Sequence, residues 1–254
     1  MKFKKYSRES FVYRKQEGEN LLIVAVYVDD LFVTGNTLEN IKEFKVGMSS
    51  NFDMSDLGRL TYYLGIEVNQ NKAGIEIKKE AYACRILKEA GLDSCNPTHI
   101  PMEFGLNMTK GQQRKPDIDA TMDQRHIDCL RYLLHTRPDL SFAVGVLSRY
   151  MQAPKESHGR VMKQILRYIQ GTLAYSLKFK KGGSKKLIGY SDSSHNVDPD
   201  GGRSTTGHVF YFGDTPISWC SQKQDRVPLS SCEAEFMAAT EADKQAILAS
   251  RLVE

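Results

Sequence analysis

Two adjacent carboxylates, Asp29 and Asp30, are the residues of this chain whose chemistry is easiest to infer. They follow Tyr27 and lie between the apolar run 21–26 and a second short apolar run, 31–34. This pattern predicts a hairpin with the carboxylates at its turn. Neighbouring carboxylates repel each other unless a divalent cation or nucleic-acid chemistry uses them. Asp29 and Asp30 are therefore candidate catalytic and metal-binding residues, and an Asp-rich turn without a function is the alternative.

Composition limits the classes of protein that come into question. The chain has 254 residues, of which 41% are hydrophobic and 26% charged, as in a soluble globular protein of one large or two modest domains. The longest apolar stretch, 21–28, is far shorter than the ~20 residues that span a bilayer. Residues 1–5 are not followed by the apolar segment of a secretory signal. We therefore expect an intracellular protein, cytoplasmic or nuclear, that is neither secreted nor bound to a membrane.

Cysteine and histidine spacing gives no sign of a disulfide framework or a metal centre. The five cysteines are odd in number, scattered and never arranged as CxxC, and the six histidines show no ligand spacing. We expect reduced thiols.

Basic residues concentrate in two tracts. Residues 1–15 carry six Lys and Arg against Glu9, and residues 155–186 carry nine against Glu156. Such tracts indicate contacts with phosphate groups, although a solvated helix face with a Lys-rich turn explains either tract equally well. The candidates for nucleic-acid contact are Tyr27, Lys163, Arg167, Lys185 and Lys186.

Periodicity in the first half of the chain predicts antiparallel hairpins and helices. After the hairpin 21–34, a capping-box pattern at Asn36–Glu39 predicts a helix. Its inward face should carry Leu38, Ile41, Phe44 and Met48. Strands are expected at 62–68 and 75–78, and a helix from about residue 79 to Gly91.

The second half is predicted to be helical and then α+β. The segment 92–120, with Pro97, Pro101, Pro116 and the polar run 110–115, suits a linker. Periodicity then predicts helices at 122–136, 139–151 and 157–170, strands at 175–180, 187–191, 208–212 and 217–220, and a last helix from about 231.

Several motifs together resemble one family. Residues 21–36 resemble the metal-binding hairpin of reverse transcriptases, in the form found in Ty1/copia-type retrotransposon Pol polyproteins. Residues 62–68 resemble the family's primer-grip hairpin, residues 96–102 its exit from the polymerase, and residues 130–140 its connection helices. Residues 189–192, 203–207 and 229–236 resemble its ribonuclease H domain. These landmarks follow the family's order, and the chain is most similar to plant copies.

The resemblance implies an α+β protein in three parts. Residues 1–102 would be the C-terminal part of the reverse transcriptase, a partial polymerase palm of antiparallel hairpins and helices. A helical connection would follow at 103–172, and an incomplete ribonuclease H-like sheet with a C-terminal helix at 173–254. The implied activities are RNA-directed DNA polymerase and RNA–DNA hybrid ribonuclease in DNA transposition and integration. The implied partners are an RNA–DNA hybrid or template-primer and the remainder of a Pol polyprotein.

A ribonuclease H site needs carboxylates that hold two divalent metals ~3.5–4 Å apart. The resemblance makes Asp192, at the end of the strand 187–191, the first ligand, and a glutamate on the last helix the second. Glu233 stands three residues after Ser230, where helix capping already explains it. We favour Glu235, which shares a helix face with four small residues that allow close approach to the sheet: Ala238, Ala239, Ala242 and Ala246. Asp198 and Asp200 are interpreted as turn formers.

The resemblance also implies that each metal site is incomplete in this chain. The family takes a further palm aspartate, and the fingers, from sequence upstream of the hairpin, which residues 1–20 cannot contain. Its other ribonuclease H carboxylates lie beyond the glutamate helix, and nineteen residues follow Glu235. We expect Asp29, Asp30, Asp192 and Glu235 to bind Mg²⁺ or Mn²⁺ weakly or not at all. The alternative function is a non-catalytic nucleic-acid-binding or relic transposon product, and departures from the family such as Asp128 on an apolar helix face agree with it.

Overall fold

The computed structural model describes residues 3–6, 9–106, 108–109, 120–195 and 198–253 of the chain. They form helices and antiparallel sheets, which confirms the α+β class. The chain divides into two compact units, residues 1–60 and 61–254. This division reflects packing, and the boundaries expected near residues 102 and 172 stay predictions.

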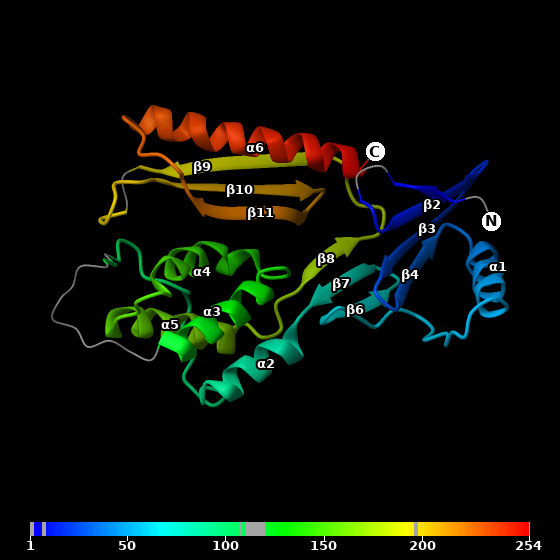
Figure 1. Cartoon of the computed structure of the whole chain (residues 1–254), viewed down its shortest axis with the longest axis horizontal. Helices are drawn as coiled ribbons and strands as arrows, with labels where there is room; N and C mark the ends of the chain where they lie inside the picture. Colours follow the sequence, from blue (N-terminus) through cyan, green and yellow to red (C-terminus); the bar gives the residue numbers. More distant parts are fainter. Residues whose placement is uncertain (1–2, 7–8, 107, 110–119, 196–197, 254) are drawn as a thin grey trace. The chain divides into compact units, whose positions relative to one another are not determined.

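The first unit is a four-stranded antiparallel sheet covered on one face by a helix (Figure 1). The sheet has the order β1-β2-β3-β4 and its core is Leu22, Val24 and Phe44. The predicted hairpin and helix are confirmed, but Leu38 was wrongly assigned to the buried face, since it is 70% exposed. The elements of this unit are β1 (Lys4–Lys5), β2 (Val12–Glu17), β3 (Asn20–Tyr27), β4 (Asp30–Gly35) and α1 (Leu38–Ser49).

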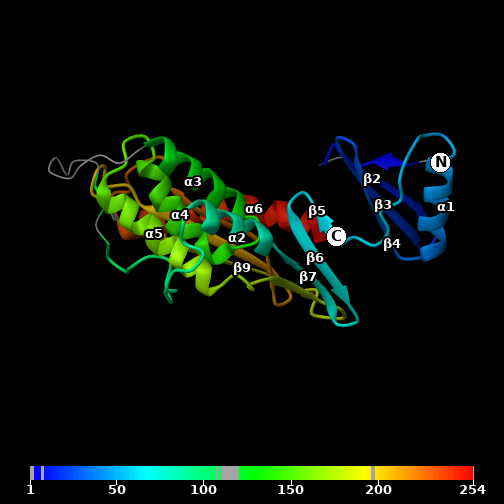
Figure 2. The ribbon, with the colours of Figure 1, turned by 90° about the horizontal axis from the view of Figure 1, so that it is seen from below.

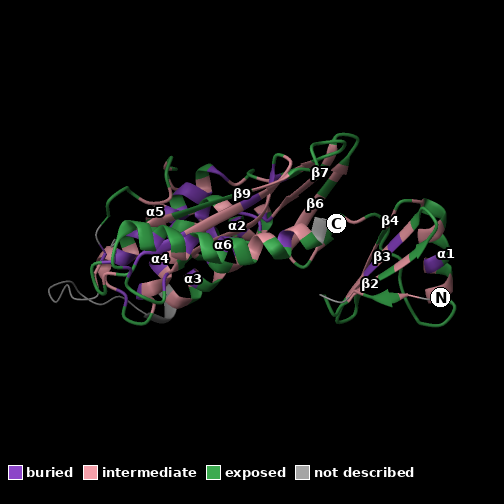
Figure 3. Cartoon of the chain, turned by 90° about the horizontal axis from the view of Figure 1, so that it is seen from above, coloured by how far each residue is buried: buried purple, intermediate pink, exposed green. Residues whose placement is uncertain are grey.

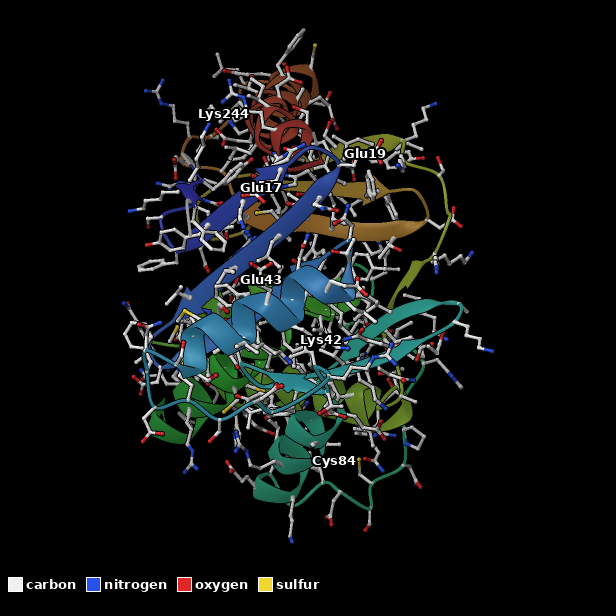
Figure 4. The ribbon with its side chains drawn as sticks, turned by 90° about the vertical axis from the view of Figure 1, so that its right-hand side faces the viewer. Glu17, Glu19, Lys42, Glu43, Cys84 and Lys244 are labelled. Atoms are coloured by element: carbon white, nitrogen blue, oxygen red, sulfur yellow. The ribbon has the colours of Figure 1, made fainter. Side chains whose placement is uncertain are left out.

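The basic tract at the start of the chain forms strands, which sequence periodicity did not reveal. Strand β1 pairs with β2, and Lys4 lies opposite Arg14. Lys15, also on β2, forms an ion pair of 3.2 Å with Glu17. The exposed Lys42 and Glu43 lie on α1 beside the buried Phe44 (Figure 4).

A second sheet, in the other unit, joins segments that are a hundred residues apart. It comprises β5 (Tyr62–Tyr63), β6 (Ile66–Asn71), β7 (Gly74–Lys78) and β8 (Leu177–Lys180) in this order. The single strand expected at 62–68 is wrong, because Leu64 and Gly65, with φ of 48° and 74°, turn the chain back. The strand expected near 175–180 exists as β8, but it pairs with β7 in this second sheet and not with the strands that follow it in the sequence.

A helical cluster forms the main hydrophobic core (Figures 2 and 3). Leu130, Leu140, Ile165 and Ile169 are fully buried there. The predicted helix 139–151 is confirmed in place but is divided into an α-helix with a 3₁₀ turn at each end. The elements are α2 (Glu80–Glu89), α3 (Ala120–Leu133), η1 (Pro138–Leu140), α4 (Ser141–Leu147), η2 (Ser148–Tyr150) and α5 (Glu156–Gly171).

The surroundings of Asp128 and of the predicted linker differ from what the sequence indicates. Asp128 was expected on an apolar face, but it is exposed and lies 3.7 Å from Arg131. The predicted linker packs on α5 in its described part, since Arg167 Nε donates to the Asn96 carbonyl at 2.7 Å. Pro116 and the polar run 110–115 lie outside the described residues.

None of the five cysteines forms a disulfide, and Cys84 of α2 is exposed (Figure 4).

A third sheet is enclosed between a long helix and the helical cluster (Figure 1). It has the antiparallel order β11-β10-β9, and α6 packs along β9 and β10. On the opposite face Trp219 Nε1 donates to the Leu134 carbonyl at 3.0 Å. No helix in the described part of the chain is long and apolar enough to cross a membrane. The elements are β9 (Leu187–Ser194), β10 (Thr205–Phe212), β11 (Thr215–Lys223) and α6 (Ser231–Val253).

The buried guanidinium of Arg137 links two parts of the helical cluster, the start of η1 and the end of α5. The Arg137 side chain is 4% exposed and donates to both carboxylate oxygens of Asp139, at 2.7 Å to the nearer one. It also donates to the Thr172 carbonyl and hydroxyl at 3.1 and 2.6 Å. Tyr168 OH donates to the same carboxylate at 3.0 Å. Every charge in this network is satisfied, so the start of η1 is fixed to the end of α5.

We predict that Arg137→Met lowers the free energy of unfolding by about 3 kcal/mol, because it removes a buried guanidinium together with its hydrogen bonds to Asp139 and Thr172. Arg160→Met is the matched control, since Arg160 pairs with Glu156 at 2.7 Å while 72% exposed. That exposed pair should contribute only about 0.3–0.5 kcal/mol. Urea denaturation of both variants measures the difference. Equal small losses would contradict a stabilising role for the buried network.

Candidate functional site

The paired aspartates lie at a strained two-residue turn. Tyr27 is opposite Asp30 in the register of β3 and β4, so Val28 and Asp29 form the turn. Val28 has a φ of 50°, a left-handed conformation that is unfavourable for a β-branched residue. Strain of this kind costs on the order of 1–3 kcal/mol and is concentrated at functional sites.

Strand alternation determines which way the carboxylates of this turn face. Val24 is buried against α1 and Val26 is partly buried in the same cluster, as expected. Side chains alternate along a strand, so Tyr27 and its cross-strand partner Asp30 belong to the face opposite α1. Both residues are exposed, as is Asp29. Tyr27 and Asp30 are therefore exposed on the face of the first sheet opposite α1, and Asp29 is exposed at the turn.

The second pair of predicted ligands, Asp192 and Glu235, lies on β9 and α6. A buried amide, Gln224 Nε2, connects these two elements: it donates to the Ser193 hydroxyl at 3.2 Å and to the Ala234 carbonyl at 3.0 Å. Ser193 therefore faces α6, and the alternation of an unbroken strand directs Asp192 to the opposite face. Sequence reasoning missed Gln224, since it follows β11 without a recognisable motif.

The two glutamates of α6 have different surroundings. Glu233 accepts a hydrogen bond from the Leu229 amide at 2.5 Å, and its own amide donates to Ser230 Oγ at 3.1 Å. The expected capping role of Glu233 is thus present. Glu235 is exposed beside Ala234 and Ala238, which are fully buried against the sheet. Of the alanines expected on its face, Ala238 and Ala242 are buried, Ala239 is exposed and Ala246 is half-buried.

The carboxylates do not assemble into a larger cluster. Within the described ranges, no group of three or more His, Cys, Asp and Glu side chains could hold a metal ion. Asp198 belongs to a turn, because its carbonyl accepts from the Gly202 amide at 2.8 Å, and its buried carboxylate pairs with Lys223. The assignment of Asp29, Asp30, Asp192 and Glu235 as metal ligands stays a prediction.

The basic tract 155–186 is distributed over several elements. Lys163 and Arg167 are exposed on α5, and Lys185 and Lys186 are exposed in the loop before β9. Three other cations of the tract are engaged in ion pairs of 2.7–3.1 Å with carboxylates: Arg160, Lys178 and Lys180. The charge available for phosphate contacts is therefore smaller than the sequence indicates.

The turn of the β5–β6 hairpin is fixed by a tyrosine and a buried lysine. Tyr132 OH donates to the Leu64 carbonyl at 2.6 Å. Lys79 Nζ donates to the Tyr132 carbonyl at 2.7 Å and lies 3.3 Å from the centre of its ring. Burial lowers the pKa of the Lys79 amine to about 8. Burial, and then the Lys79 charge, lower the pKa of the nearby His135.

Taken together, the paired carboxylates on an antiparallel hairpin backed by a helix are the arrangement of a polymerase palm. The family described as reverse transcriptase (RNA-dependent DNA polymerase) matches residues 1–104. The chain belongs to the Ty1/copia-type retrotransposon Pol family.

Three relatives illustrate this membership. The chain is 36% identical over 221 residues, 87% of its length, to the Pol polyprotein from transposon RE2 of Arabidopsis thaliana, and 32% identical over 260 residues, 99% of its length, to that from transposon TNT 1-94 of Nicotiana tabacum. It spans only 15% and 19% of these polyproteins. An uncharacterized mitochondrial protein of Arabidopsis thaliana is 35% identical over 220 residues, which cover 85% of this chain and 90% of that protein. No solved structure matches the chain significantly.

We predict that Asp29→Asn combined with Asp30→Asn leaves the thermal stability of the isolated chain unchanged or raises it, because repulsion between neighbouring carboxylates is relieved. Thermal unfolding should be followed in Mg²⁺ buffer and in chelator. A clear loss of stability in Mg²⁺ that disappears in chelator would contradict the prediction and show that a metal binds at this turn.

We predict that stability rises between about pH 8 and the unfolded pKa of lysine near 10.5, because the unfolded state binds more protons at Lys79 in this window. Below pH 8 the amine is charged in both states and the cost of burying it is constant. Lys79→Met should lack this rise. Urea midpoints measured from pH 7 to pH 9.5 test it, and parallel curves for the two proteins would show that Lys79 is not the cause.

Proposed function

We propose that residues 20–35 supply the turn of a reverse-transcriptase palm that holds a divalent cation, Mg²⁺ or Mn²⁺, at the growing end of a nucleic-acid strand. The observation that carries this proposal is the exposed Asp29–Asp30 pair at the turn between β3 and β4, which is strained at Val28. Two oxygen-rich side chains suit a hard cation. When bound, such an ion activates and orients the reacting oxygens of phosphoryl transfer.

We further propose that Asp192 and Glu235 belong to a ribonuclease H-type site that acts on the RNA strand of a hybrid. Each of the two sites draws on two carboxylates of these 254 residues, fewer than a metal pair needs for charge neutralisation. On this proposal the chain acts together with further Pol sequence, inside the cell, on an RNA–DNA hybrid or a template-primer.

A specific observation favours a second candidate function, non-catalytic binding of nucleic acid. The alternation of β9 directs Asp192 away from α6, which carries Glu235. A metal pair needs its carboxylates to converge, and this placement of Asp192 does not favour such an arrangement. On this reading the exposed Lys163, Arg167, Lys185 and Lys186 contact backbone phosphates while the carboxylates take no part in a reaction.

We predict that the purified 254-residue chain binds a labelled RNA–DNA hybrid with an affinity that falls steeply as salt rises, because phosphate contacts release counterions. It should neither extend a primer nor cut the RNA strand in Mg²⁺ or Mn²⁺, because members of a catalytic unit act together and the loss of part of it removes most of the rate.

The matched control is the double variant Asp192→Asn with Glu235→Gln, which keeps the side-chain volumes and removes two charges. Cleavage by the chain that disappears in this variant would overturn the non-catalytic interpretation and establish the ribonuclease H-type site. Binding that does not change between two salt concentrations would remove the case for phosphate contacts.

A further inference from the structure

A groove of about 320 Å³ runs between the helical cluster and the edge strand β11. Its walls come from the end of α3, from α4 and η2, and from the end of β11, all within the second unit. Three of its lining residues are cations, Arg131, Arg149 and Lys223, and none is acidic. The other polar residues of the lining are three serines and Gln222. None of the three cations belongs to either basic tract of the sequence.

Two of these cations are held in place by hydroxyl groups. Arg149 Nη2 donates to Thr205 Oγ1 at 2.9 Å, and Arg131 Nε donates to Ser148 Oγ at 3.3 Å. Ser148 in turn donates to the Val144 carbonyl of α4 at 2.7 Å. Each guanidinium has five N–H donors in a rigid plane, so further donors remain for a ligand after these contacts.

The charges around the groove do not balance. Lys223 pairs with the buried Asp198, and Arg131 lies 3.7 Å from the exposed Asp128. Burial lowers the pKa of Arg149, and the charge of Asp198 raises it in part. In the part of the chain that the structure describes, the three cations that line the groove are paired with two carboxylates, Asp128 and Asp198, and Asp128 is largely solvated. A partly desolvated site with excess positive charge favours an anion.

Ser221 of β11 belongs to the lining of the groove. Ser221 Oγ is inaccessible to solvent and makes no hydrogen bond among the described residues. Gly145 of α4 lies directly opposite, and a Cβ at this position would come within 3.0 Å of the Ser221 carbonyl. The glycine therefore allows α4 to approach β11 closely beside the groove that both elements line.

We propose that this groove binds one phosphodiester group of a nucleic-acid strand, through Arg131, Arg149 and Lys223. The inference rests on the proposed function and adds a site to it. Guanidinium donors that line one groove match the oxygens of a phosphate, and a volume near the lower end of ligand sites suits a group of nucleotide size.

The test compares the wild-type chain with Arg131→Gln combined with Arg149→Gln, with each single variant, and with Arg125→Gln. The control Arg125 lies on the same helix, α3, and pairs with Glu89 at 3.1 Å outside the groove. Fluorescence anisotropy with a labelled RNA–DNA hybrid gives affinity as a function of salt. Thermal unfolding shows that each variant is folded, and Arg131→Gln is the variant that keeps the test valid if the double variant does not fold.

We expect the double variant to bind the hybrid about a hundredfold more weakly near 0.1 M salt, with a slope of log affinity against log salt that is smaller by about two. Arg125→Gln should match the wild type. Wild-type binding with no effect of the groove variants would overturn the groove proposal alone, whereas absence of wild-type binding would overturn the proposed function and the groove with it. Binding of poly-glutamate that depends on Arg149, together with unchanged hybrid binding, would assign the groove to an acidic polypeptide and also overturn the proposal.

Discussion

The fold of the second unit depends on the burial of one positive charge. Arg137 follows α3 and its guanidinium reaches both Asp139 and the end of α5 at Thr172. A guanidinium that is nearly inaccessible to water is tolerated only when its donors are satisfied, and this requirement fixes where the chain turns between α3 and α4. Tyr168 contributes to the same network from within α5. The position of β8, which starts five residues after Thr172 and pairs with β7, follows from this anchor.

The two predicted metal-binding regions differ in how their geometry is produced. At Asp29 and Asp30 it is local: a two-residue turn and strand alternation place the carboxylates whatever the rest of the chain does. At Asp192 and Glu235 it is non-local, because it depends on which face of β9 the helix α6 covers. The amide of Gln224 decides this by binding the β9 side chain of Ser193 and the α6 backbone together.

The same distinction explains what could be predicted from the sequence. The β3–β4 hairpin, α1, α2 and the capping role of Glu233 depend on contacts within a few residues, and periodicity and turn chemistry were sufficient for them. The pairing of β8 with β7 was not predictable, since it joins segments a hundred residues apart. Leu38 was placed in the core by helical spacing, but the small first sheet extends only far enough to cover Phe44 and its neighbours.

The distribution of charge over the surface is the property that the sequence predicts least well. A run of basic residues in the sequence predicts a positive surface only if folding brings no carboxylate beside it, and Glu156, Glu76 and Asp214 neutralise three cations of the tract 155–186. The groove between α4 and β11 shows the converse. Its cations come from three distant segments, and α3, η2 and β11 bring them together only when the helical cluster packs on the third sheet. The positive charge of this groove is therefore a property of packed elements, and no run of basic residues in the sequence indicates it.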